Sequence, residues 1–239
     1  MKKKIVFIMN PISGTSSKAA VPSLIDSTLD KEQFEYEIKM TERPEHASEL
    51  AAEARDNHAD IVVAVGGDGT VNEVARSLVH SDSALGILPC GSGNGLARHL
   101  LLPMNLKKSI EIINACEIHD LDYGVINEYP FFCTCGMGFD AFVSMKFAES
   151  GKRGPISYAE NILREGLKYE PETYTLEDET GTKQYKAFLI SCANASQYGN
   201  NAYIAPQASM SDGLMDVVIM EPFDVIEASQ VSFDMFNKT

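Results

Sequence analysis

The stretch IVVAVGGDGTVNEV, residues 61–74, decides the fold of this 239-residue chain. Its first five residues carry no formal charge and four of them are β-branched, which is typical of a strand buried on both faces. Gly66, Gly67 and Gly69 then allow a sharp turn and a close approach of the backbone to a ligand. Thr70 suits the start of a helix, whose free backbone N–H groups favour an anion. The stretch therefore predicts a strand, a phosphate-binding turn and a helix.

Strand and helix patterns alternate on both sides of this stretch. We expect strands at residues 3–9, 34–40, 61–65 and 85–88, and helices at 17–29, 44–57, 70–79, 94–101 and 106–115. This alternation predicts an α/β fold, a mainly parallel sheet with helices on both faces. Ligands of such sheets bind beyond the carboxyl ends of the strands. The glycine-bearing loops after Met9, Val65 and Leu88 all fall there, so they can converge on one site.

The pattern changes near residue 117, where short strands begin to dominate. We expect strands at residues 129–135, 174–177, 186–193 and 215–220, a hairpin turn at 179–182, and helices at 141–148 and 157–168. In the second of these helices, Ile162, Leu163 and Leu167 either close a core or touch a ligand. The chain thus divides into an α/β domain at residues 1–116 and a β-rich domain at residues 117–239.

The charge balance limits the partners of the protein. With 34 acidic and 20 basic residues the formal net charge is −14, which argues against broad nucleic-acid binding and weakens any polybasic membrane anchor. No apolar run reaches the ~20 residues of a membrane span, and no signal peptide is evident. We therefore expect a cytoplasmic protein without a transmembrane segment. One basic cluster forms either a solvated helix face or a peripheral contact with a membrane surface: Lys146, Lys152, Arg153, Arg164 and Lys168.

Five scattered cysteines indicate reduced thiols rather than disulfides, and none has the spacing of a zinc site. Cys133 and Cys135 fall on one face of a predicted strand. They are either small core residues or a metal or redox pair.

Three loops carry the chemistry: NPISG at residues 10–14, GGDGTVNEV at 66–74 and LPCGSGNGLAR at 88–98. Neither the P-loop pattern nor the dinucleotide fingerprint is present. Glycine clusters also form turns without a ligand, but three of them at strand ends indicate a different phosphate cradle.

In their order and spacing these motifs resemble the diacylglycerol kinase catalytic-domain family, which includes bacterial lipid kinases and the sphingosine and ceramide kinases. GMGFDA at residues 136–141 and SDGLMDV at 211–217 are similar to later family motifs, so the resemblance covers almost the whole chain. It implies an NAD kinase-like nucleotide domain followed by a sandwich-like lipid domain. The implied activity is transfer of the γ-phosphoryl group of ATP to a lipid hydroxyl, of diacylglycerol or sphingosine type.

The resemblance also implies site residues. Asp68 would be catalytic, orienting or deprotonating the lipid hydroxyl, although the same carboxylate suits a helix cap. Magnesium would bind at Ser209, Asp212 and Leu214, partly through backbone carbonyls, although Asp212 and Gly213 also suit a plain turn. Asp140 either faces the lipid headgroup or caps a helix. The implied ATP-binding residues are Asn10, Ser13, Gly14, Thr41, Gly66, Gly67, Asp68, Gly69, Thr70, Asn72, Gly91, Ser92, Gly93 and Asn94.

One departure concerns the end of the chain. Family members continue beyond the Asp-Gly-Leu-x-Asp motif through further strands to an Asp-Gly-Glu segment, whereas this sequence stops at Thr239 after a predicted helix at residues 223–238. We therefore expect an incomplete second domain with an unpaired sheet edge and exposed apolar surface. Such a surface favours association, for instance as a homodimer.

Two other functions remain open at this point. An NAD kinase shares the Gly-Gly-Asp-Gly loop, but the loop at residues 89–98 argues against it. A nucleotide-binding protein that has lost turnover with its C-terminus is the non-enzymatic alternative. The Gly-Ser-Gly-Asn form of the third loop is closer to sphingosine-type kinases, while diacylglycerol is the acceptor most common in the family.

Overall fold

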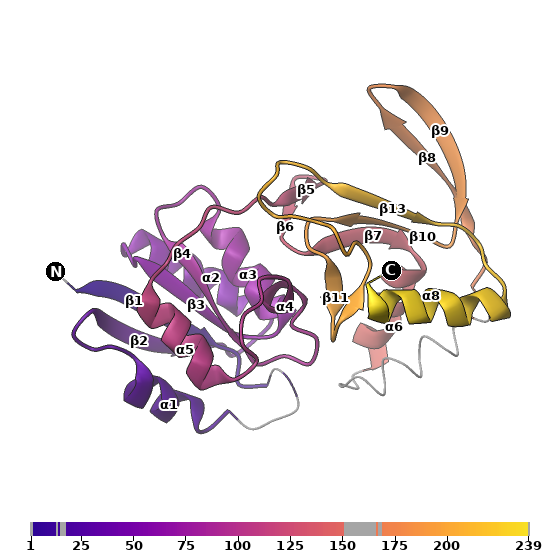
Figure 1. Ribbon diagram of the computed structural model, residues 1–239. Coiled ribbons are helices and arrows are strands. Elements are labelled where there is room, and N and C mark those ends of the chain that lie inside the picture. The colour runs from indigo at the N-terminus through magenta and orange to yellow at the C-terminus, as the bar shows by residue number, and fades with distance from the viewer. Residues whose placement is uncertain (1, 13, 15–17, 151–165, 167–168, 239) are drawn as a thin grey trace.

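A four-stranded parallel sheet forms the first half of the computed structural model, which describes residues 2–12, 14, 18–150, 166 and 169–238 (Figure 1). Its strands lie in the order β2-β1-β3-β4, so the order reverses between β1 and β3, where this class of sheet binds ligands. The strands are β1 (Lys3–Met9), β2 (Phe34–Met40), β3 (Ile61–Gly66) and β4 (Ala84–Pro89). The helices are α1 (Val21–Thr28), α2 (His46–Asp56), α3 (Asp68–Leu78), α4 (Gly95–His99) and α5 (Leu106–Ala115). We call residues 2–115 the parallel-sheet part.

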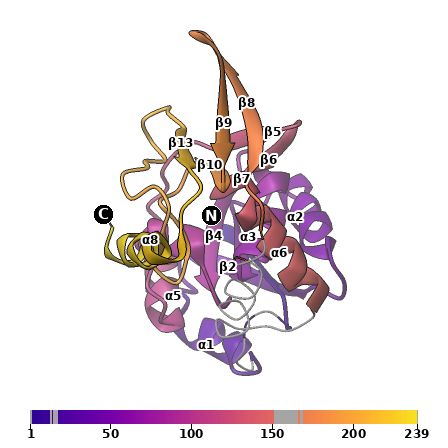
Figure 2. The ribbon, with the colours of Figure 1, turned by 90° about the vertical axis from the view of Figure 1, so that its right-hand side faces the viewer.

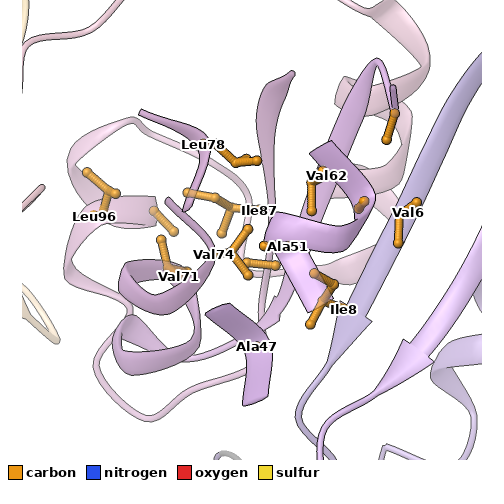
Figure 3. Packing of buried hydrophobic residues seen from close by; sticks show 14 of the residues in the cluster. Val6, Ile8, Ala47, Ala51, Val62, Val71, Val74, Leu78, Ile87 and Leu96 are labelled. Atoms are coloured by element: carbon orange, nitrogen blue, oxygen red, sulfur yellow. The ribbon is translucent and has the colours of Figure 1, made fainter. Parts of the chain in front are cut away.

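Both faces of this sheet are buried, because successive residues of a strand point to opposite sides. On β1, Val6 and Ile8 join one apolar cluster, and the residues that alternate with them join the other. Helices α2 and α3 cover the first face, where Ala51 and Val74 approach the strands (Figure 3). Helices α1 and α5 cover the second face through residues such as Ile25. The double burial explains why β3 is an unbroken apolar run.

A smaller antiparallel sheet dominates residues 124–237, which we call the antiparallel-sheet part. Its strands, in the order β13-β10-β7, are β7 (Thr134–Gly138), β10 (Leu189–Ala193) and β13 (Asp216–Met220). Three hairpins accompany it, and the β8–β9 hairpin projects away from the remainder in both views (Figure 1 and Figure 2). They are β5 (Gly124–Ile126) with β6 (Tyr129–Phe131), β8 (Glu172–Asp178) with β9 (Gly181–Ala187), and β11 (Gln197–Gly199) with β12 (Ala202–Tyr203). The helices are α6 (Phe139–Ser150) and α8 (Val225–Asn237).

The core of the antiparallel-sheet part is built around aromatic rings. The ring of Phe188 lies 4.5 Å from that of Phe139 and 4.6 Å from that of Phe223, measured between centroids. Leu189 and Ala193 project from β10 into the same cluster. The other face of the sheet, formed by the residues that alternate with these along the strands, carries partly exposed side chains, including Val217, which is 51% exposed. This sheet therefore has one well-covered face.

The two parts share a core. Ala195 and Met210, which follow β10 and β12 in the chain, are buried in the cluster that α2 and α3 form with the parallel sheet. Phe132 and Cys133 pack against the same cluster. The antiparallel-sheet part is thus fixed to the side of the parallel sheet that carries α3 and α4.

The predicted fold class, a parallel α/β sheet followed by a β-rich region, is confirmed. The single strand expected at residues 129–135 is instead two, β6 and β7, because the chain bends at Phe132 and Cys133; the strand expected at 186–193 is likewise split between β9 and β10. The helix expected at 157–168 lies outside the described residues, apart from Gly166. Within the described ranges, no helix has the length and apolar character needed to span a membrane. The domain boundary at residues 116 and 117 stays a prediction.

Candidate phosphate site and its surroundings

Three loops meet at the carboxyl ends of β1, β3 and β4. The backbone N–H of Asn10, just after β1, donates to the carbonyl of Val65 on β3, and the N–H of Cys90, just after β4, donates to the carbonyl of Gly66. The sheet hydrogen bonds thus continue into the loops on either side of β3. The three motifs identified in the sequence lie next to one another.

Glycines let the backbones of these loops touch. A Cβ built on Gly91 would lie 2.4 Å from Cα of Gly67, and one built on Gly14 would lie 2.2 Å from the carbonyl oxygen of Cys90. A Cβ closer than 3.0 Å to a backbone atom would clash with it, so neither position can accept a side chain without a shift of the backbone. Gly14 also has a φ of 71°, a conformation that favours glycine. The loop glycines are therefore required by the approach of one main chain to another.

Asn94 closes the third loop on itself. Its Oδ1 accepts from the N–H of Gly91 at 2.8 Å, and its Nδ2 donates to the carbonyl of the same residue at 2.9 Å. Asn94 is buried and adopts a left-handed conformation with a φ of 54°, which asparagine tolerates better than most residues. Its side chain therefore shapes the loop rather than pointing into the site.

The other predicted nucleotide-binding residues surround the glycine loops. Asn10 Nδ2 lies 3.4 Å from Oγ1 of Thr70 in the first turn of α3, and its Oδ1 accepts from the N–H of Ile12. Thr41 is buried after β2, with its N–H donating to the carbonyl of Met9. Gly69 and Ser92 are exposed, Asn72 is half-buried on α3, and Ser13 lies outside the described residues.

Asp68 stands at the start of α3 and points toward α4. Its Oδ1 accepts from the N–H of Leu96 at 3.4 Å, and its Oδ2 lies next to Gly93, on which a Cβ would come within 3.2 Å. Burial raises the pKa of the Asp68 carboxyl above its ordinary value, while the backbone N–H groups of Leu96, Gly95 and Asn94 act in the opposite direction. Asp68 does not cap its own helix, where Gly67 is the N-cap; it binds amides of a neighbouring one.

The antiparallel-sheet part contributes a second carboxylate and thiols. Asp140 Oδ2 accepts from the hydroxyl of Tyr198 at 3.1 Å, and burial raises the pKa of the Asp140 carboxyl. Cys133 donates to the carbonyl of Gln197 at 3.3 Å; burial, and to a smaller extent the charge of Asp68, raise the pKa of this thiol to about 12. Residues from both parts therefore lie around the third glycine loop and Asp68.

Cys133 and Cys135, for which small core residues and a metal or redox pair were the two alternatives, have different neighbours. Cys135 lies directly opposite Cys192 in the register of β7 and β10, and burial followed by interaction with Cys192 raises its pKa to about 11. Cys133 instead bonds to the β11 backbone. Thiols with raised pKa values are poor nucleophiles and metal ligands at neutral pH.

Two known domain families match successive parts of the chain. Residues 4–126 match the family model of the diacylglycerol kinase catalytic domain, and residues 133–235 match that of the YegS C-terminal NAD kinase beta sandwich-like domain. The chain belongs to the diacylglycerol kinase catalytic domain family. The resemblance drawn from the three loops is thereby confirmed.

Proteins similar to this member of the diacylglycerol kinase family carry names that are consistent with that family. A protein called probable lipid kinase YegS from Escherichia fergusonii is 28% identical, with 84% of this chain and 69% of the relative covered. A diacylglycerol kinase from Staphylococcus saprophyticus is 27% identical, with 97% of this chain and 77% of the relative covered. The fold matches a putative diacylglycerol kinase from Bacillus anthracis with a TM-score of 0.72 at 20% identity, covering 99% of this chain and 80% of that one.

The loop proposed to hold magnesium is fixed by a residue that sequence reasoning did not single out. Asp122 Oδ2 accepts from the N–H of Gly213 at 2.8 Å, and the N–H of Asp122 donates to the carbonyl of Met210. Asp212 Oδ1 accepts from the N–H of Leu214 at 3.0 Å, which is the turn expected as the alternative. Among the residues that the structure describes, no three His, Cys, Asp or Glu side chains form a metal-binding group. Hydroxyl, carboxylate and carbonyl oxygens remain the donor set of this loop, and they suit Mg²⁺, which keeps several waters.

Lys18 is a further residue that the sequence did not reveal. Its side chain is buried, with 7% exposed, although lysine is almost never fully buried without a partner. Burial raises the pKa of the Cys90 thiol, and the positive charge of Lys18 opposes that effect. Lys18 therefore lies near the third glycine loop. Of the predicted basic cluster, Lys152, Arg153, Arg164 and Lys168 fall outside the described residues, and nothing of the Lys146 side chain is described.

Proposed function

We propose that the protein transfers the γ-phosphoryl group of ATP to a lipid hydroxyl, with Asp68 as the catalytic group. The observation that carries the proposal is the contact of three glycine loops around the position of Asp68, at the carboxyl ends of β1, β3 and β4. Phosphoryl transfer requires positioning and charge neutralisation more than covalent help from the protein. A cradle built from main chain suits that requirement.

The nucleotide would bind along the glycine loops. The backbone N–H groups at residues 67–70, 92 and 93 would provide donors for its phosphates, whereas those of Gly91 and Asn94 are bonded to Asn94 Oδ1 and to Asp68. Asn10, Gly14 and Thr41 would lie alongside, with the charge of Lys18 close to the third loop. Asn72 and Ser13, the latter outside the described residues, complete the predicted set. ATP supplies the phosphoryl group in this scheme.

Asp68 would orient the acceptor hydroxyl and remove its proton. Burial raises the pKa of its carboxyl, which strengthens it as a base. The amides of α4 fix the carboxylate in one direction. The acceptor then approaches from the antiparallel-sheet part, where the hydroxyl of Tyr198 and the carboxyl of Asp140 provide polar contacts for a headgroup.

Ser209, Asp212 and the carbonyl of Leu214 would hold Mg²⁺, which would stabilise the loop between β12 and β13. This assignment rests on oxygen donors and on the fixed position of the loop against Asp122. Asp122 holds the loop through the N–H of Gly213.

The test is a transfer assay with γ-labelled ATP and three acceptors: diacylglycerol and sphingosine in detergent micelles, and NAD in solution. We expect label in a lipid product and none in NADP. Label in NADP alone would make the protein an NAD kinase. Tight ATP binding without label in any acceptor would support the non-enzymatic alternative.

A further inference from the structure

Helix α4 is held along its length by the antiparallel-sheet part. Asn94 forms an antiparallel bridge with Gly199, and the N–H of Asn200 donates to the carbonyl of Gly93 at 3.1 Å. A Cβ on Gly199 would come within 2.8 Å of the Gly93 backbone, so the two main chains touch. The segment at residues 196–201, which we call the β11 segment, therefore lies against the first turn of α4.

A histidine joins the other end of α4 to the same segment. The N–H of Ser196 donates to Nδ1 of His99 at 3.1 Å, so this ring nitrogen carries a lone pair, and the Ser196 hydroxyl lies 3.0 Å from the same atom. Ser196 is buried, with 6% exposed. Burial also lowers the pKa of His99, which keeps the ring neutral and able to accept at neutral pH.

A second side-chain contact between α4 and the β11 segment is weaker. Arg98 Nη1 lies 3.5 Å from Oδ1 of Asn201 in an exposed position, and Arg98 Nε donates to the carbonyl of Gly93 within its own loop. Exposed contacts of this length contribute little. The bond between His99 and Ser196 is a buried side-chain link from α4 to the antiparallel-sheet part.

The opposite end of the same helix binds Asp68. Leu96, whose N–H donates to Asp68 Oδ1, is only three residues before His99, and α4 is five residues long. A helix this short has about one turn of its own hydrogen bonds, so neighbouring contacts set its position. A shift of the β11 segment would move the amides that hold the Asp68 carboxylate.

We propose that His99 is a positioning residue, which fixes α4 against the β11 segment and thereby sets the direction of the Asp68 carboxylate for the acceptor. For its effect on turnover this inference rests on the proposed phosphoryl transfer. It assigns to the antiparallel-sheet part a role in aligning Asp68 as well as in binding the acceptor.

The test compares His99→Leu, which removes the acceptor atom, with His99→Asn, whose Oδ1 occupies the place of Nδ1. We expect kcat of His99→Leu to fall about ten-fold, the scale of one unpaired buried N–H group, with KM for ATP changed less than about two-fold. His99→Asn should recover most of the loss. His119→Leu, the same change at an exposed histidine, is the matched control and should leave both constants unaltered.

A second readout does not depend on activity. Amide hydrogen exchange at residues 94–97 and the carboxyl ¹³C shift of Asp68 should change in His99→Leu and return toward wild type in His99→Asn. If both readouts stay at wild-type values in His99→Leu, the inference is wrong, whatever the turnover. If they change while the wild-type protein phosphorylates no acceptor, the coupling stands and the proposed function fails. A melting curve identifies any variant that is unfolded.

Discussion

The parallel-sheet part and the antiparallel-sheet part differ in how the faces of their sheets are covered. The first sheet is buried on both faces by helices, and its strand ends are joined through backbone contacts between glycine loops. The second sheet has one well-covered face, and residues such as Val217 are half exposed on it. The difference predicts that the parallel-sheet half of the site is the more rigid one. Under the proposed function, phosphate binds to a frame of main chain, whereas the acceptor side consists of side chains on a less enclosed sheet.

The sharpest way to test that division is Asp68→Asn. The amide keeps the acceptor oxygen for the N–H of Leu96 but removes the base, so we expect kcat to fall by about 10³-fold. Nucleotide affinity should change by less than about three-fold, because the main chain of the loops is unaltered. Steady-state kinetics and calorimetric titration with ATP measure the two effects. Equal losses in both would contradict a catalytic role for Asp68.

Phe188→Ala tests whether the two parts fail independently. It removes the ring that contacts Phe139, Tyr169 and Phe223, at an expected cost of about 3–5 kcal/mol in the free energy of unfolding. We expect lipid phosphorylation to be lost before ATP binding as urea is added. Simultaneous loss of both activities would show that the shared core around Ala195 and Met210 makes the two parts one cooperative unit.

Gly91→Ala tests the rigidity of the phosphate frame. The new methyl group would meet Cα of Gly67 and the Oδ1 of Asn94, so we expect a loss of about 1–3 kcal/mol in unfolding free energy together with weaker ATP binding. Gly69→Ala is the matched control, because a Cβ there meets nothing within 4 Å and helix α3 gains about 0.5–1 kcal/mol. Urea denaturation of both variants separates steric conflict from general sensitivity of the loop. A stability of Gly91→Ala equal to that of wild type would count against the frame.

The smallest effect concerns pH. Because burial raises the folded-state pKa of Asp68 above its unfolded value, the folded protein binds more protons between these values and its stability falls as pH rises through them. Asp68→Asn should therefore melt at a higher temperature than wild type at pH 7.5. The difference should vanish below the ordinary range for aspartate. Asp120→Asn, at an exposed position, serves as the control and should show no such trend.

The parallel sheet was predictable because its chemistry is local and repetitive. The strand at residues 61–65 is apolar without interruption, and the observed β3 ends one residue later, at Gly66. The three loops could be placed together because strand ends of a parallel sheet share one edge. The family followed from those loops, and the later motifs extended it over the chain.

Other features depended on contacts that no local pattern encodes. The bend between β6 and β7 is held by Asn194, whose Nδ2 donates to the carbonyls of Asp122 and Phe132 and whose backbone N–H donates to the carbonyl of Cys133. Each of these bonds joins residues more than sixty positions apart in the sequence. Asp122 and His99 act through backbone groups that are distant in sequence. Lys18 lies next to Cys90 only because the loops after β1 and β4 meet. No local sequence motif marks the positions of Asp122, His99 and Lys18.

The backbone contact between Gly67 and Gly91 also limits which substitutions this chain can accept. The smallest possible substitution, a methyl group, is already larger than the space available, so the width of the phosphate site cannot be adjusted in small steps by mutation. Under the proposed function, the acceptor side consists of side chains such as Asp140 and Tyr198, which can be exchanged for others, whereas the donor side depends on a main-chain contact that tolerates no added atom.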